Sequence, residues 1–174
     1  MSAEGLEPKG EREIDDHVKI PIVNRRGEIR YFLIDKEDFE RVSKYRWYAD
    51  KKGYVANESG YLHRYIMRAQ VGEIVDHKNT NPLDNRKCNL RLCTYAQNCW
   101  NKRKYKNNST NFKGVNYDAS NNKFRARICV DGTRYCLGRY FTAEAAGRAY
   151  DNAARILHKE FARLNIPDEG EEAA

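Results

Sequence analysis

Four polar residues in the middle of the chain have the types and the spacing expected of a phosphodiester-cleaving site. Asp76 and His77 follow a short apolar run, and Asn89 and Asn98 come 12 and 9 residues later in turn. A hydrolytic cut needs a base for water and a cation that neutralises charge growing on the phosphate. His77, with an unperturbed pKa of about 6.5, is a suitable base at neutral pH. Asp76 and Asn98 offer hard oxygen ligands for Mg²⁺ or Mn²⁺, and Asn89 is expected to brace the intervening loop and orient His77.

The elements around these residues predict a strand, a polar loop, a second strand and a helix. The apolar run ends at His77, NLRLC (89–93) is typical of a strand, and Thr94-x-x-Gln97 is a capping-box signature. Asn98 then falls in the first turn of the helix. Such a hairpin would fold Asp76 and His77 back beside Asn98, although an Asp-His pair in a loop is, taken alone, more often a hydrogen-bonded turn.

The cysteines favour neither a zinc site nor a disulfide framework. The chain has five cysteines and no C-x-x-C pair, and three of them, Cys88, Cys93 and Cys99, crowd the predicted hairpin. A structural zinc ion there would need four ligands at a spacing that the sequence does not provide. We therefore expect reduced thiols that fill space, and no structural zinc.

The same stretch resembles a known nuclease family. DHKNTNPLDNRKCNLR followed by QNCWNKRK is similar to the HNH nucleases, in the His-Asn-Asn form of phage and intron-encoded homing endonucleases. The resemblance implies that His77 is the general base, that Asp76 and Asn98 hold one divalent metal ion, and that Asn89 shapes the fold. LHRYIM (62–67) resembles the histidine-arginine helix of that family, but we assign its His63 no chemistry.

Composition and charge point to a polyanionic partner. The chain has 174 residues, is 40% hydrophobic, and has no apolar run near the roughly 18 residues of a membrane span. Secretion and membrane insertion are disfavoured, and we expect a cytoplasmic protein of a bacterial host cell, encoded by a phage or mobile element. The net charge of +7 conceals two acidic tails, 1–16 and 167–174, each of charge −4, around a segment of charge +15. Such a basic segment is expected of a nucleic-acid-binding protein, although a charged surface can also simply aid solubility.

The pattern predicts an α+β protein with two modules between the tails. Residues 17–108 form the first, with strands at 18–23 and 30–34, a short helix capped by Asp35, and a helix at 62–69. A basic linker ends this module. Lys102, Arg103, Lys104 and Lys106 are expected to track the DNA backbone there.

Residues 109–166 predict three strands and a helix, at 112–118, 122–130, 133–141 and from Thr142 to just before Pro167. Asp131-Gly132 is a strong hairpin signal, and it places Ala126 opposite Leu137 and Arg125 opposite Gly138. One sheet face then becomes apolar and faces a stripe on the helix, while the other collects arginines. The stripe comprises Ala146, Ala149, Tyr150, Ala153, Ile156 and Leu157.

The arginine face could enter a DNA major groove, where arginine bonds guanine, or it could be an ordinary solvated face. The segments STNFKGVNYD and KFRARICVDGTRYCLGRYFTAEAAGRAYDNAA resemble the plant APETALA or ethylene-response-factor domain, which reads DNA with its sheet. By position, the resemblance implies DNA contacts from Lys113, Asn116, Lys123, Arg125, Arg127, Arg134 and Arg139. In the predicted register Arg139 points with the apolar set unless a bulge at Gly138 turns it.

Together these features predict a ββα-metal HNH nuclease module followed by a three-stranded antiparallel sheet packed on one helix. We expect a homing or phage-type endonuclease that cuts double-stranded DNA, as a monomer on an asymmetric site, by nicking or double-strand cleavage. A non-catalytic transcriptional regulator that keeps the hairpin as a scaffold is the competing hypothesis. An RNA-directed nuclease is disfavoured, because side chains cannot read the deep, narrow major groove of A-form RNA.

Overall fold

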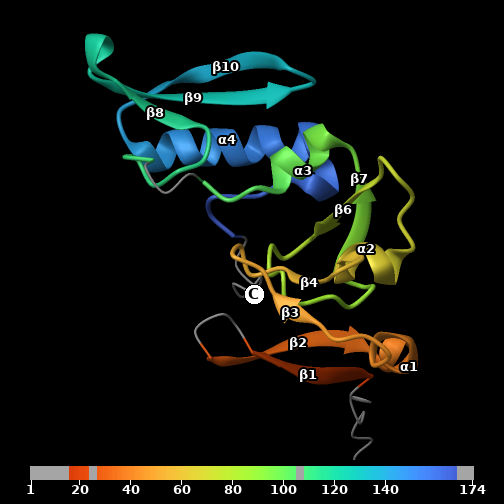
Figure 1. Ribbon diagram of the computed structural model, residues 1–174. Coiled ribbons are helices and arrows are strands. Elements are labelled where there is room, and N and C mark those ends of the chain that lie inside the picture. Colours follow the sequence, from red (N-terminus) through yellow and green to blue (C-terminus); the bar gives the residue numbers. More distant parts are fainter. Residues whose placement is uncertain (1–15, 24–26, 105–107, 168–174) are drawn as a thin grey trace, which may run out of the picture.

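The computed structural model of the protein describes residues 16–23, 27–104 and 108–167. The acidic tails expected at 1–16 and 167–174 lie outside these residues, apart from Asp16 and Pro167, and so does Lys106. Figure 1 shows the β8–β10 sheet and helix α4 at one end of the molecule and the β1–β2 hairpin at the other, with β6, β7 and α3 between them.

The first elements of the described residues are the antiparallel strands β1 (His17–Val23) and β2 (Ile29–Asp35). A short 3-10 helix, η1 (Lys36–Asp38), and α1 (Phe39–Val42) follow. The sequence predicts that Asp35 caps this helical stretch, but its side chain makes no capping hydrogen bond to η1. Its Oδ2 instead accepts a hydrogen bond of 2.8 Å from the backbone nitrogen of Lys87, so it ties the hairpin to the loop that follows His77.

A second small sheet contains β3 (Tyr48–Ala49), β4 (Val55–Asn57) and β5 (Gly60–Tyr61), and it leads into α2 (Leu62–Met67). Apolar side chains from these elements, from the first hairpin and from the next pair of strands form one core. Phe32, Ile34 and Leu62 are fully buried in it. This core supports the strands that carry Asp76 and His77, because Val75 and Leu90 belong to the same cluster.

The predicted hairpin consists of β6 (Ile74–His77) and β7 (Leu90–Cys93), followed by α3 (Tyr95–Asn101). The capping box at Thr94 is confirmed, because the Thr94 side chain accepts from the nitrogen of Gln97 and the Gln97 side chain accepts from the nitrogen of Thr94. Backbone hydrogen bonds attach the loop between β6 and β7 to β2. Leu33 of β2 donates to the carbonyl of Leu83 at 2.8 Å and accepts from the nitrogen of Asn85 at 2.9 Å.

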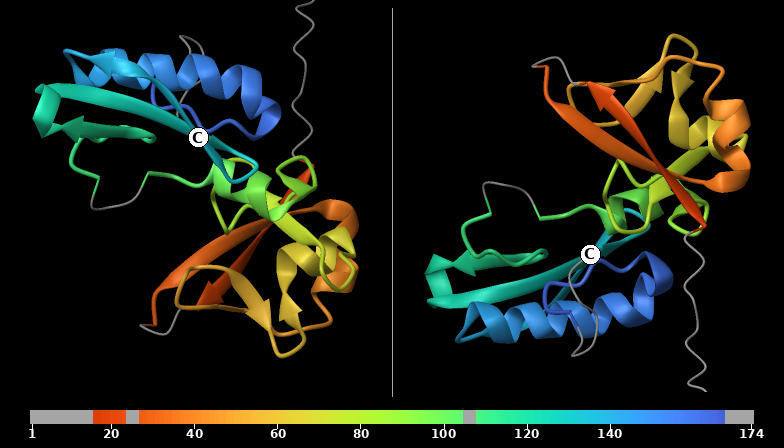
Figure 2. Two further views of the ribbon diagram at one scale, coloured as in Figure 1. Left: turned by 90° about the horizontal axis from the view of Figure 1, so that it is seen from above. Right: turned by 90° about the horizontal axis from the view of Figure 1, so that it is seen from below.

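Beyond the linker, β8 (Val115–Asp118), a short 3-10 helix η2 (Ala119–Asn121), β9 (Lys123–Val130) and β10 (Thr133–Tyr140) form an antiparallel sheet in the order β10-β9-β8. Helix α4 (Ala143–Leu157) covers one face of this sheet, as Figure 2 shows from two directions. Thr142 caps α4, as predicted, because its side chain accepts from the nitrogen of Ala145.

The helix is shorter than the sequence predicted. It ends at Leu157, and a 3-10 turn, η3 (Lys159–Phe161), follows with Lys159 at a left-handed φ of 50°. The predicted apolar stripe is also partly wrong, since Ile156 is 72% exposed. The apolar side chains that α4 buries belong to Ala146, Tyr150 and Ala154, and the buried stripe ends there, since Leu157 of the last turn is also 41% exposed.

The β9–β10 hairpin has the predicted Asp131-Gly132 turn, with left-handed φ values of 48° and 81°. Its register is as predicted from Val130–Thr133 to Arg127–Cys136 and then shifts at a bulge. Leu137 is the extra residue, so Ala126 lies opposite Gly138 rather than Leu137. Arg125 therefore lies opposite Arg139, and the bulge turns Arg139 toward the arginine face.

None of the helices among the described residues has the length and apolar character needed to cross a membrane.

Candidate active site

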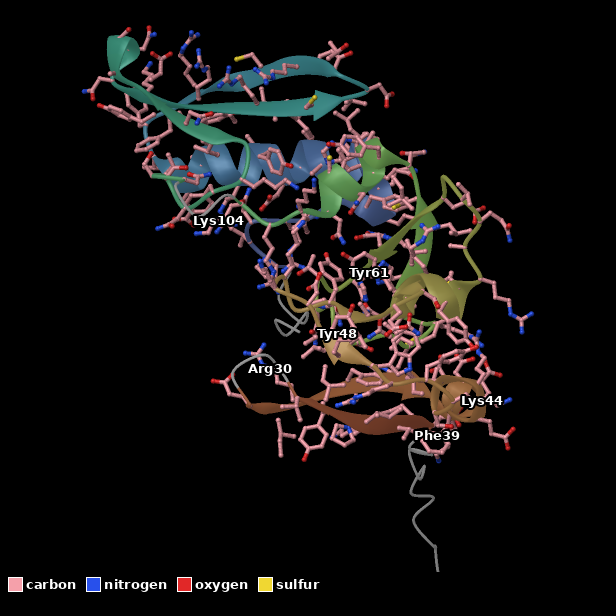
Figure 3. All side chains as sticks on the ribbon, viewed as in Figure 1. Arg30, Phe39, Lys44, Tyr48, Tyr61 and Lys104 are labelled. Atoms are coloured by element: carbon pink, nitrogen blue, oxygen red, sulfur yellow. The ribbon has the colours of Figure 1, made fainter. Side chains whose placement is uncertain are left out.

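Asp76 and His77 at the end of β6 and Asn98 of α3 line one cleft of about 450 Å³. Aromatic and basic side chains also line the cleft. Tyr61, labelled in Figure 3, lies on its wall together with His63 from α2. Lys102 and Arg103, which the sequence assigned to a linker, also line this cleft.

A single hydrogen bond orients the buried His77 ring. His77 is only 5% exposed, and its Nε2 lies 3.2 Å from Oδ1 of Asn85. The amide nitrogen of Asn85 donates to the carbonyl of Pro82, which can only accept, so Oδ1 of Asn85 must face the imidazole. This assigns the proton to Nε2 of His77, which leaves the lone pair on Nδ1 to accept a proton.

His77 is neutral at physiological pH. Burial lowers its pKa, and the hydrogen bond to Asn85 and the carboxylates of Asp76 and Asp84 offset this effect only in part. A neutral imidazole is the form that a general base requires. The environment therefore keeps His77 ready to accept a proton.

His63, to which the sequence pattern assigns no chemistry, lies beside His77. The two rings are 5.0 Å apart in an edge-to-face arrangement, and His63 also stacks on Tyr61 at 5.4 Å. Burial, with smaller contributions from His77 and Arg64, lowers the pKa of His63 to about 3. Its Nδ1 is buried and hydrogen-bonds to no other described residue. Only the resemblance of LHRYIM to a family helix could have drawn attention to it.

Two side chains that the sequence analysis missed hold the carboxylate of Asp76. Arg91, opposite Asp76 on β7, donates to Oδ2 from Nε at 3.0 Å and from Nη2 at 2.9 Å. Asn101 of α3 donates to Oδ2 at 2.9 Å and to Oδ1 at 3.1 Å. Within the described part of the chain, three donor atoms thus reach Oδ2 and one reaches Oδ1, so Oδ1 is the freer ligand atom. Neither Arg91 nor Asn101 belongs to a recognisable sequence motif. Arg91 reaches Asp76 through the pairing of β6 with β7, and Asn101 reaches it because α3 packs beside β6.

The donor set fits a hard cation that keeps much of its water. The carboxylate of Asp76 and the carboxamide of Asn98, which hydrogen-bonds to no other described side chain, both line the cleft. Among the described residues there is no cluster of three or more His, Cys, Asp or Glu side chains suited to a metal ion. Mg²⁺ commonly binds through one or two protein oxygens, substrate phosphate and waters, so two oxygen donors suit it.

The side-chain hydrogen bonds of Asn89 brace the loop and go to Asn79 and Asp84 rather than to His77. Oδ1 of Asn89 accepts from the nitrogen of Asn79 at 3.0 Å, and its Nδ2 donates to the carbonyl of Asp84 at 2.7 Å. The expected bracing is present, whereas the hydrogen bond that orients His77 comes from Asn85. Asn89 therefore acts on the imidazole only through the shape of the loop.

On the sheet, most of the predicted DNA contacts share the face that α4 leaves uncovered. The bulge adds Arg139, whose Nε donates to Asp118 at 2.9 Å, and Arg125 lies 3.9 Å from the same carboxylate. Arg127 reaches Asn116 at 3.2 Å. The residues of this arginine face are Asn116, Lys123, Arg125, Arg127, Arg134 and Arg139.

Lys113, to which the resemblance assigns a DNA contact, does not lie on that face. It precedes β8, and its ammonium donates to the carbonyls of Trp100 and Lys102. Burial lowers the pKa of Lys113 to about 8. Lys104, labelled in Figure 3, is likewise engaged within the protein, because it donates to Oδ1 of Asn111 at 2.7 Å.

Sequence similarity to known proteins identifies the family of this chain. A sequence profile of the HNH endonucleases matches residues 60–99. An uncharacterized HNH endonuclease of Acanthamoeba polyphaga mimivirus is 36% identical over 165 residues, which are 89% of this chain and 84% of the relative. The chain belongs to the HNH endonuclease family. Protein 3.8 of Escherichia phage T7 is 29% identical over 93 residues, which are 53% of this chain and 76% of that protein.

No solved structure matches the chain. The HNH profile spans α2, the β6–β7 hairpin and the first turns of α3, so the HNH segment contains His63 as well as Asp76, His77 and Asn98. The relationship to the mimivirus HNH endonuclease extends well beyond this segment, over most of both chains.

Proposed function

We propose that this HNH endonuclease hydrolyses phosphodiester bonds of double-stranded DNA with one divalent metal ion, Mg²⁺ or Mn²⁺. The observation that carries the proposal is the His77 imidazole, held neutral and in one tautomer in the same cleft as Asp76 and Asn98. Homologues from a giant virus and a phage support a phage or mobile-element setting, as in homing endonucleases.

In this mechanism Nδ1 of His77 removes a proton from the attacking water, while Nε2–H stays bonded to Asn85. Attack on the phosphorus breaks its bond to the 3′ oxygen, which takes a proton from solvent water, and the products are 5′-phosphate and 3′-hydroxyl ends. Asp76 and Asn98 would hold the cation, which when bound stabilises the charge that develops on phosphate and leaving group. Lys102 and Arg103 at the rim of the cleft supply further positive charge for the phosphate backbone.

We further propose that the arginine face of the C-terminal sheet binds the DNA major groove. The support is its composition and its position, since α4 covers the other face and leaves these side chains open. The resemblance to the APETALA or ethylene-response-factor domain rests on sequence motifs and is consistent with three antiparallel strands followed by a helix.

The test is conversion of supercoiled plasmid to nicked or linear DNA with Mg²⁺ or Mn²⁺, against EDTA. We expect wild type to convert the plasmid, His77→Ala to lose at least about 100-fold in rate, and EDTA to stop the reaction. Lys44→Ala is the matched control, because Lys44 lies on the surface beyond α1, away from the cleft (Figure 3). The ratio of nicked to linear product reports whether one strand or both are cut.

A plasmid can lack the target, so the assay is repeated on DNA selected for binding to the full-length protein. Tight binding without metal-dependent cleavage of the selected DNA would favour the non-catalytic regulator. Cleavage that His77→Ala leaves intact would refute the assigned base. Competition between duplex DNA and duplex RNA tests the preference for DNA.

A further inference from the structure

The C-terminal part, residues 108–167, contacts the hairpin and helix of the candidate site through the end of α4 and through η3. Trp100 of α3 stacks on His158, with ring centroids 4.4 Å apart and planes at 9°. The guanidinium of Arg91 lies 3.9 Å over the ring of Phe161 in η3. Nη1 of Arg91 donates to the carbonyl of Glu160 at 2.5 Å. Figure 1 shows α3 against the end of α4 where these contacts occur.

These contacts leave Arg91 a single orientation. Nε and Nη2 donate to Asp76, Nη1 donates to Glu160, and one face of the guanidinium lies on Phe161. The side chain is only 10% exposed. The planar fork of arginine can meet a carboxylate with two parallel bonds while it stacks on an aromatic ring, and lysine can do neither. Without η3, Arg91 would lose an acceptor and its aromatic support.

The segment that supports Arg91 is itself fixed to the C-terminal sheet. Nε2 of His158 donates to the carbonyl of Cys129 on β9 at 3.0 Å. Lys159 adopts a left-handed φ of 50°, which turns the chain so that Glu160 and Phe161 face β7. A continuous set of contacts therefore runs from β9 through His158 and η3 to Arg91, and from Arg91 to the carboxylate of Asp76.

We propose that the C-terminal part is a structural component of the catalytic centre, because Phe161 and Glu160 hold Arg91 as a positioning residue for Asp76. On this account its role exceeds that of a DNA-binding module joined by a linker. The inference rests on the proposed function, in which Asp76 is a metal ligand. It predicts that substitutions in η3 raise the metal concentration needed for half-maximal cleavage even when DNA affinity is unchanged.

The test uses two substitutions at Phe161 in the full-length protein. Phe161→Leu retains apolar volume and removes the ring face, whereas Phe161→Tyr retains the ring and is the matched control. The first readout needs neither metal nor DNA. Solvent exchange of the Arg91 Nε–H proton, measured by NMR, is expected to be slow in wild type and Phe161→Tyr and at least about tenfold faster in Phe161→Leu.

The second readout is Mn²⁺ dependence, by direct titration of Mn²⁺ binding and by plasmid nicking. We expect Phe161→Leu and Arg91→Lys to raise the half-saturating Mn²⁺ concentration about tenfold, while DNA affinity in EDTA stays within about twofold and Phe161→Tyr behaves as wild type. Unchanged proton exchange in a folded Phe161→Leu protein would overturn the inference, whatever the activity. Absence of cleavage in wild type would instead count against the proposed function, and the exchange measurement would still decide the inference.

Discussion

Nε2 of His77 lies 3.2 Å from Oδ1 of Asn85, and the amide nitrogen of Asn85 is bound to the carbonyl of Pro82. Asn85 is completely buried, and its backbone nitrogen donates to Leu33 of β2. The N-terminal hairpin thereby fixes the loop, the loop fixes Asn85, and Asn85 fixes the imidazole. The tautomer assigned to the candidate base depends on a strand more than 40 residues earlier in the chain.

Asn85→Leu should therefore lower kcat by about 10- to 100-fold with little change in DNA affinity, because the ring loses the bond that orients it. Plasmid nicking under single-turnover conditions measures the rate, and anisotropy in EDTA measures binding. Asn79→Ala is the matched control, since it removes side-chain hydrogen bonds to Asp84 and Asn81 in the same loop and none to the His77 ring. Equal losses in both variants would mean that the loop as a whole, rather than Asn85, sets the rate.

The pH dependence of cleavage should follow the lowered pKa of His77. We expect the acid limb of the rate profile to lie below the ordinary value of 6.5 in wild type, because burial favours the neutral ring. In Asn85→Asp a carboxylate would face Nε2–H and favour the imidazolium, so the acid limb should move to higher pH. A shift to lower pH would contradict the assigned hydrogen bond.

Acid should destabilise the fold through His63. Its pKa is about 3 in the folded protein against 6.5 when unperturbed, so the unfolded state binds the proton first as pH falls. The stability that neutral His63 permits is fully present above pH 6.5 and is lost as pH falls toward 3. Urea unfolding at pH 7 and pH 4.5 should show a smaller loss in His63→Phe than in wild type. An identical loss would assign the acid sensitivity to other groups.

Gly114 should be the least replaceable glycine of the C-terminal sheet. It has a left-handed φ of 77°, and an added Cβ would lie 2.2 Å from the Tyr150 ring and 2.6 Å from the carbonyl oxygen of Arg127. We expect Gly114→Ala to cost about 3 kcal/mol or more in unfolding free energy. Gly132→Ala has a similar φ of 81° with no atom near the new Cβ, so its cost should be about 1 kcal/mol. Equal losses of unfolding free energy in the two variants, measured by urea titration, would show that the left-handed φ rather than the close contacts determines the loss.

The arginine face should determine the salt dependence of DNA binding. Arg127→Ala is expected to reduce the slope of log affinity against log salt by about 1 if Arg127 contacts a phosphate. Arg148→Ala on the exposed side of α4 is the control, because its guanidinium pairs with Glu144 away from the sheet. An unchanged slope in Arg127→Ala, measured by anisotropy across a salt series, would argue against this face as the DNA contact.

Much of the local structure follows from short-range signals in the sequence. Thr94-x-x-Gln97 forms its capping box, Thr142 caps α4, and Asp131-Gly132 makes the β9–β10 turn. Each depends on a few neighbouring residues whose own hydrogen bonds or φ preferences decide the outcome. The spacing of His77, Asn89 and Asn98 can also be read from the sequence, and it resembles that of the HNH family to which the chain belongs.

Only the tertiary structure decided what surrounds those residues. The bulge at Leu137, which moves Arg139 to the arginine face, and the early end of α4 depend on packing between elements. Arg91, Asn85 and His63 carry no signal of spacing, because each acquires its role by meeting a partner brought close by strand pairing or by a shared core. The sequence by itself thus determined the chemical groups and the local turns. The orientation, protonation and support of those groups arise from long-range contacts, since burial and partner geometry exist only once the chain has folded.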